Sequence, residues 1–168
     1  MTRIIAGEAR GRTIKVPAEG TRPTADRARE GLFSSLTARW GFAGSSVLDL
    51  FAGSGALGLE AASRGADEAV LVESSADAVK VIRHNMGVVK HPGVRVQEMK
   101  VSTYLASAPR KHFDLVLADP PYAFDEVDEL IAAIEPVLCD HAMVVIERHV
   151  DSADTVWPAG FEPTGQKL

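Results

Sequence analysis

The sequence has a single cysteine, Cys139, and only 6% of its 168 residues are aromatic. One cysteine excludes an internal disulfide, so we expect a protein of a reducing cytoplasm rather than a disulfide-stabilised secreted scaffold. No apolar run reaches the ~20 residues that a bilayer-spanning helix requires, so no membrane partner is expected. The five histidines show no ligand spacing, and with one cysteine no metal site is predicted.

The charge of the chain is unevenly distributed. Its net value is −5, yet the first 40 residues carry eight lysines and arginines against four acids. A basic end on an acidic body is typical of a local phosphate-binding surface, although a solvated basic arm is an equal alternative. The length predicts one domain with a single core.

The first 40 residues contain two apolar-alternating segments, 3–6 and 12–16, joined by a link with two glycines. This spacing predicts a β-hairpin with a long loop. Thr24 is a candidate N-cap for a helix that runs to about Trp40. The opening of the chain is therefore expected to be an arm followed by a helix.

From Ser45 onward, short apolar strands alternate with helical patterns. Strands that are apolar on both faces lie between layers of helices, and repeated βα units predict an α/β fold with a doubly wound, mainly parallel, Rossmann-like sheet. We divide the chain into a hairpin arm, 1–22, and this larger domain, 23–168. The strand candidates are 46–50, 68–73, 94–98, 113–118 and 142–147, and the helix candidates are 56–64, 76–89, 101–108 and 126–138.

A glycine-rich turn follows the first of these strands. Gly53, Gly55 and Gly58 form the pattern G-x-G-x-x-G. Asp49 stands at the tip of the strand before it, and Glu73 closes the next strand. In an open α/β sheet such a turn binds a ligand, and both NAD and S-adenosylmethionine fit the pattern. An anion at Asp49 favours S-adenosylmethionine, because this cofactor is cationic and carries no phosphate. The glycine pattern by itself still allows either cofactor.

The tetrapeptide Asp119-Pro120-Pro121-Tyr122 follows the strand 113–118, at the same carboxyl edge of the sheet. Its prolines stiffen the turn and leave carbonyl acceptors. The Asp119 carboxyl and the Pro120 carbonyl can accept both N–H groups of an exocyclic amine, and Tyr122 offers a face on which a base can stack. We therefore predict methylation of a nucleobase amine, with Asp119 orienting the nitrogen rather than acting as a strong base.

Motifs over nearly the whole chain resemble the RsmD-type 16S rRNA guanine-N2 methyltransferases. Segments 3–7, 10–12, 22–24 and 29–30 are similar to the opening of that family. The stretches Asp49-Leu50-Phe51-Ala52-Gly53-Ser54-Gly55 and Asp119-Pro120-Pro121-Tyr122 are similar to its cofactor and catalytic motifs.

The resemblance implies a class I methyltransferase fold and transfer of a methyl group from S-adenosylmethionine to N2 of the guanine customarily numbered 966. The 16S rRNA would be presented on the small ribosomal subunit or an assembly intermediate, and the hairpin arm would contact it. The resemblance and the motifs together name Asp119, Pro120 and Tyr122 as catalytic. The expected cofactor residues are Asp49, Phe51, Ala52, Gly53, Gly55, Glu73, Val101 and Asp119, and the expected RNA contacts are Arg10, Arg12, Arg22, Thr24, Arg29 and Tyr122.

Two features depart from the family pattern. Lys100 stands where such enzymes commonly place an acid that accepts from the adenine amine, so adenine would rely on backbone groups around Val101. The end of the chain, 161–168, reads as the approach to a strand, and the family's closing hairpin is expected to be incomplete.

Three other functions stay open. A methyltransferase of adenine N6 or cytosine N4 in DNA would also use the 119–122 motif, but the short chain leaves no domain that reads a DNA sequence. An NAD-linked oxidoreductase would leave that motif unexplained. A non-catalytic rRNA-binding factor would tolerate Asp119→Ala. We expect the protein to be a monomer.

Overall fold

The computed structural model describes residues 1–16, 23–121, 126–148 and 155–164. The predicted site residues Arg22 and Tyr122 lie outside these ranges. None of the helices within them has the length and apolar character that crossing a bilayer needs. The elements are β1 (Thr2–Arg3), β2 (Thr13–Ile14), α1 (Pro23–Arg39), β3 (Ser46–Leu50), α2 (Ala56–Ser63), β4 (Glu68–Glu73), α3 (Ala76–Val89), β5 (Val94–Glu98), α4 (Val101–Ser107), β6 (Phe113–Ala118), α5 (Val127–Ile134), the 3-10 helix η2 (Glu135–Val137) and β7 (Leu138–Ile146).

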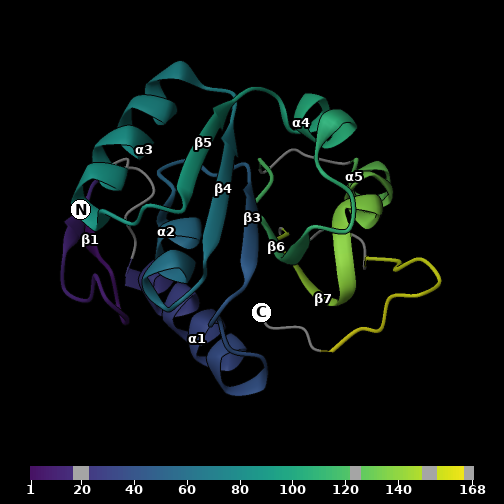
Figure 1. Ribbon diagram of the computed structural model, residues 1–168, viewed down its shortest axis with the longest axis horizontal. Helices are drawn as coiled ribbons and strands as arrows, with labels where there is room; N and C mark the ends of the chain where they lie inside the picture. The colour runs from purple at the N-terminus through teal and green to yellow at the C-terminus, as the bar shows by residue number, and fades with distance from the viewer. Residues whose placement is uncertain (17–22, 122–125, 149–154, 165–168) are drawn as a thin grey trace.

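Five strands form one parallel sheet in the order β5-β4-β3-β6-β7 (Figure 1). The predicted doubly wound α/β fold is confirmed. The chain leaves the central strand β3 toward β4 and β5, and then returns to add β6 and β7 on the other side. The carboxyl ends of β3 and β6 therefore flank the switch point of the sheet, where ligands bind in open α/β folds.

Alternate residues of β3 enter different cores, because successive side chains of a strand point to opposite faces. Val47 is buried in a cluster with Phe33 of α1 and Ile82 of α3. Leu48 is buried in a second cluster, with Leu105 of α4. Helices α1, α2 and α3 thus cover one face of the sheet, and α4 and α5 cover the other (Figure 1).

The N-terminal hairpin is shorter than predicted and packs against the helices. Each of its strands has two residues. Ile4 and Ile14 are buried in the core that includes α1, α2 and α3. The buried Glu60 of α2 accepts hydrogen bonds from the backbone N–H groups of Ile5 and Ala6, at 2.8 and 3.1 Å. The hairpin and the larger domain share this core, and the division at residue 22 stays a prediction.

Several element boundaries differ from those predicted, most of them by one residue. Thr24 is not an N-cap, because α1 begins at Pro23, whose fixed φ and missing N–H suit the first helical turn. Helix α5 ends at Ile134, because Pro136 cannot donate the next helical hydrogen bond. Leu138, predicted as helical, instead begins β7, which pairs irregularly with the start of β6.

Residues 155–164 contain no strand, so the strand approach expected from residue 161 is not formed over 161–164. The rings of Trp157 and Phe161 stack instead, with centroids 5.6 Å apart. Arg39 of α1 donates to the carbonyl of Thr164 at 3.1 Å. The segment therefore contacts the end of α1 at Thr164, whereas Val156 and Pro158 lie beside Asp128 and Ile131 of α5.

Candidate functional site

The glycine turn lies at the carboxyl end of β3. Gly53 and Gly55 have positive φ angles of 60° and 82°. A Cβ atom on Gly55 would lie 2.7 Å from the Leu71 side chain, so only glycine fits there without a shift. Among the described atoms, none lies within 4 Å of the corresponding position at Gly53. Gly55 thus packs the turn onto β4, whereas Gly53 keeps its outer side open to a ligand.

Glu73, at the end of β4, holds this turn with one carboxylate oxygen and the start of α3 with the other. Its Oε1 accepts from the Gly53 N–H at 2.8 Å, and its Oε2 accepts from the Ser75 N–H at 2.8 Å. The Ala52 N–H donates to the Val72 carbonyl at 3.0 Å. Each carboxylate oxygen keeps a second lone pair, so Glu73 can position the turn and still accept from a ligand.

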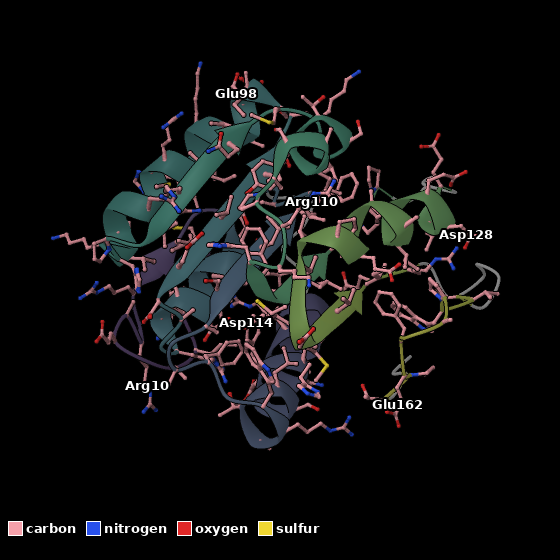
Figure 2. All side chains as sticks on the ribbon, turned by 45° about the vertical axis from the view of Figure 1, so that its right-hand side comes forward. Arg10, Glu98, Arg110, Asp114, Asp128 and Glu162 are labelled. Carbon is pink, nitrogen blue, oxygen red and sulfur yellow. The ribbon has the colours of Figure 1, made fainter. Side chains whose placement is uncertain are left out.

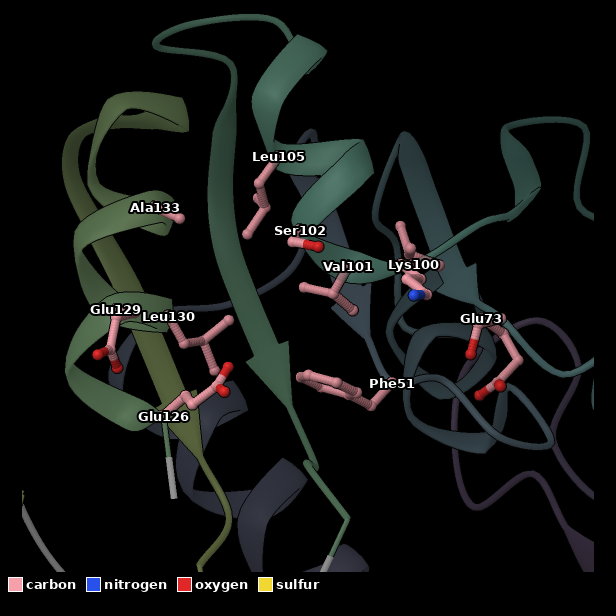
Figure 3. A pocket seen from close by; sticks show the side chains of 12 residues that line it. Phe51, Glu73, Lys100, Val101, Ser102, Leu105, Glu126, Glu129, Leu130 and Ala133 are labelled. Atoms are coloured by element: carbon pink, nitrogen blue, oxygen red, sulfur yellow. The ribbon is translucent and has the colours of Figure 1, made fainter. Parts of the chain in front are cut away.

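A cavity of about 270 Å³ lies beside the turn, with Phe51 and Glu73 in its wall. Figure 3 shows Leu130 and Glu126 on one side of it and Val101 of α4 on the other. Of the predicted cofactor residues, Phe51, Glu73 and Val101 line the cavity, whereas Asp49, Ala52, Gly53, Gly55 and Asp119 lie outside its wall. The remaining lining residues are Val72, Ser74, Lys100, Ser102, Leu105, Glu126, Glu129, Leu130 and Ala133.

Asp49 is buried, with 1% of its surface exposed. Its Oδ2 accepts from the Gly58 N–H at 2.9 Å, and its Oδ1 has no hydrogen-bond partner among the described residues. Burial is the main cause that raises the pKa of Asp49 to about 8; the Gly58 hydrogen bond lowers it, and the charges of Asp119 and Glu73 raise it. The raised pKa favours the protonated carboxyl in the ligand-free protein, so the anion expected at this position depends on the ligand that approaches it. The place of Asp49 in cofactor binding stays a prediction.

Asp119 follows β6 and is tied to the end of β3. Its N–H donates to the Leu50 carbonyl at 3.4 Å, which brings the start of the 119–122 motif beside the glycine turn. The Asp119 side chain is exposed on one side, but protein surrounds the rest of the carboxyl. This desolvation, together with the charge and the hydrogen bond of Glu147, raises the pKa of Asp119 to about 7. Pro120 is half-buried beside it.

The predicted RNA contacts have different environments. Arg10 is exposed on the hairpin. Arg12 is also exposed, and its Nη1 donates to the carbonyls of Val88 and Val89 at the end of α3, at 3.3 and 2.9 Å. Thr24 lies in the first turn of α1. Arg12 therefore anchors the hairpin to α3, and RNA binding by all three residues stays a prediction.

Arg29 is turned toward the hairpin and is only 8% exposed. Its Nη2 donates to the Thr2 hydroxyl at 3.0 Å and to the Arg3 carbonyl at 2.8 Å. Its Nη1 has no partner within the described ranges. These contacts give Arg29 a structural function between α1 and β1, and a direct contact with substrate stays a prediction.

The structure places at the site several residues that the sequence pattern does not indicate. Glu126 and Glu129, which belong to the predicted helix 126–138, line the cavity. Glu147 was read as the end of a strand, yet it hydrogen bonds to Asp119. A usable signal existed for Glu147, because it follows the strand next to β6 at the carboxyl edge.

Comparisons with known proteins agree with this architecture. Ribosomal RNA small subunit methyltransferase D of Escherichia coli strain K12 is 36% identical over 169 residues, which cover 99% of this chain and 84% of the relative. The solved Escherichia coli protein yhhF superposes with a TM-score of 0.86 at 36% identity, covering 99% of this chain and 91% of that chain. Precorrin-6y C5,15-methyltransferase of Geobacter metallireducens GS-15, 20% identical with a TM-score of 0.64, covers 79% of this chain and 66% of that chain and shares the fold.

The family model described as Conserved hypothetical protein 95 matches residues 2–168. The match and the relatives extend over almost the whole chain, as did the motif resemblance. The chain therefore belongs to the RsmD-type family, Conserved hypothetical protein 95.

Proposed function

We propose that the protein binds S-adenosylmethionine at the carboxyl edge of its sheet and methylates N2 of a guanine in 16S rRNA. The Escherichia coli relative is named a ribosomal RNA small subunit methyltransferase. The observation that carries the proposal is the position of Asp119, whose turn is hydrogen bonded to the end of β3 beside the glycine turn. A ligand in the cavity and an amine at Asp119 would therefore be neighbours.

The residues at this edge fit S-adenosylmethionine. Glu73 would accept from the ribose hydroxyls, and the apolar wall with Val101 and Leu130 would hold the adenine. The unpartnered Oδ1 of Asp49 offers a buried acceptor for a cationic ligand. When bound, the cofactor supplies an electrophilic methyl group on a positively charged sulfur. NAD fits less well, because its pyrophosphate would meet the carboxylate of Glu73 in the cavity wall.

Adenine recognition requires an acceptor for the exocyclic amine. Lys100 cannot accept a hydrogen bond, but the Ser102 hydroxyl and the Glu126 carboxylate line the same cavity. We assign the amine to one of these two groups. This assignment replaces the expectation that backbone groups alone would serve.

Asp119 and Pro120 would hold the target amine. The Asp119 carboxylate accepts one N–H and the Pro120 carbonyl accepts the other, so the nitrogen lone pair is directed at the methyl group. The new N–C bond makes the amine acidic, and its proton then leaves to the nearby carboxylate or to water. Tyr122, by stacking on the guanine, would supply about 1–3 kcal/mol of binding.

The product of the reaction tests the function. Small subunits purified from cells that lack the enzyme are incubated with protein and tritiated-methyl cofactor, and the modified base is mapped by mass spectrometry. We expect one N2-methylguanine in 16S rRNA. A methylated adenine or cytosine would contradict the target, and rRNA binding without transfer would indicate a non-catalytic factor. Calorimetric titration distinguishes the two candidate cofactors: we expect saturable binding of S-adenosylhomocysteine and no binding of NAD.

Two substitutions of Asp119 test its function. Asp119→Ala removes the acceptor and should lower kcat by about 10²-fold. Asp119→Asn keeps a carbonyl acceptor and should lose much less. Asp140→Ala, at an exposed acid of β7, serves as the control. Equal losses in the two Asp119 variants would indicate proton abstraction instead of orientation.

A further inference from the structure

Glu147 lies beside Asp119 at the end of the neighbouring strand. Strands β6 and β7 are parallel, with Ala118 opposite Ile146. The Glu147 N–H donates to the Ala118 carbonyl at 2.9 Å, so the register continues one residue past both strands. Side chains at matching positions of adjacent parallel strands project to the same face. The two carboxyl groups therefore meet, and they form a side-chain hydrogen bond.

A hydrogen bond between two carboxyl groups needs a proton, because two ionised carboxylates are both acceptors. Further titratable and charged groups lie around the pair. Asp49 of β3 interacts electrostatically with Asp119 and with Glu73 of β4. On the other side, Arg148 follows Glu147 and donates to the Thr155 hydroxyl at 3.1 Å.

We propose that Glu147 is a positioning residue for Asp119, and that the two carboxyl groups share one proton. This inference rests on the proposed function. The shared proton ties one Asp119 oxygen to Glu147 and leaves the other oxygen facing the target amine. It agrees with the raised pKa of Asp119, to which the charge and the hydrogen bond of Glu147 contribute.

The pair can be tested without substrate or cofactor. In ¹³C NMR of the ligand-free protein, the Asp119 carboxyl should titrate near pH 7 in the wild type. Glu147→Gln removes the neighbouring negative charge, so the Asp119 midpoint should move to lower pH by about one unit or more. Glu98→Gln, at an exposed acid that ends β5, should leave the midpoint unchanged. An unchanged Asp119 titration in Glu147→Gln would overturn the proposal.

Kinetics then separate positioning from charge alone. Glu147→Ala loses the hydrogen bond and should lower kcat by about tenfold or more with little change in the KM for RNA. Glu147→Gln keeps a donor to Asp119, so it should regain most of kcat at pH 8 and shift the acid limb of the rate profile to lower pH. Equal kcat in the Ala and Gln variants would contradict positioning. If the NMR coupling is present but no methyl transfer occurs, the proposed function fails while the carboxyl pair stands.

Discussion

At the scale of single residues, Asp49 is the group whose chemistry depends most on its surroundings. It faces the core that holds α2, and among the described residues its carboxyl accepts a hydrogen bond from the Gly58 N–H alone. A side chain at position 58 would crowd it, because a Cβ atom there would lie 3.1 Å from the Asp49 Oδ2. Its raised pKa favours the neutral carboxyl in the ligand-free protein, and a nearby cation would favour the ionised form.

We predict that S-adenosylmethionine binding releases a proton at pH 7. Because the cationic ligand favours ionised Asp49, affinity should rise with pH toward 8, by at most about tenfold per pH unit for one proton. Calorimetry at pH 7 in buffers of different ionisation enthalpy measures the release. Asp49→Asn keeps the acceptor for Gly58 and should release fewer protons, whereas Asp119→Asn controls for the second group that titrates near this pH. Equal release by wild type and Asp49→Asn would exclude Asp49 as the source.

At the scale of elements, the hairpin is held in place by buried polar groups of α2 and α3. Glu60 accepts two hairpin N–H groups and also pairs with Arg64 Nε at 2.8 Å. The buried Asn85 of α3 accepts from the Lys15 N–H and donates to the carbonyls of Lys15 and Ser54. Asn85 thus connects the hairpin with the glycine turn. Packing of the hairpin against α3 therefore helps to hold the glycine turn in place.

Glu60→Ala should destabilise the protein by about 3 kcal/mol, because it removes the acceptor of two hairpin N–H groups and of Arg64 Nε. Urea unfolding measures the loss. Glu60→Gln keeps one acceptor oxygen, so its free energy of unfolding should lie between those of the wild type and Glu60→Ala. Glu98→Ala, at an exposed acid, should change stability by less than about 0.5 kcal/mol. If Glu60→Ala is as stable as Glu98→Ala, the hairpin does not depend on this carboxylate.

At the scale of the whole molecule, cations gather where the hairpin meets α3. Arg12 reaches the last turn of α3, and the backbone of Lys15 bonds to Asn85 in the same helix. Arg83 and Lys90 on α3 are exposed, as are the hairpin cations. This basic face extends the positive surface that the first 40 residues indicate, and it suits an RNA backbone. Figure 2 shows Arg10 at the hairpin, well apart from Arg110, which lies before β6.

Arg83→Glu should weaken binding to a 16S rRNA fragment by about tenfold at low salt and flatten the slope of log Kd against log salt. Arg110→Glu makes the same charge change at an exposed site away from this face. It should have little effect on either quantity. Filter binding over a salt series measures both. Equal effects of the two variants would mean that only the net charge matters and that α3 is no part of the RNA surface.

The sequence by itself determined the βα order, four strands with their bounds, and the meeting of two motifs at one sheet edge. Apolar runs that are buried on both faces and end in turn residues carry this information locally, as 46–50 and 113–118 show. Only the tertiary structure decided that the pKa of Asp49 is raised, that Arg29 turns to the hairpin and that Glu147 meets Asp119. These properties depend on desolvation and on partners distant in the chain, which no local pattern records.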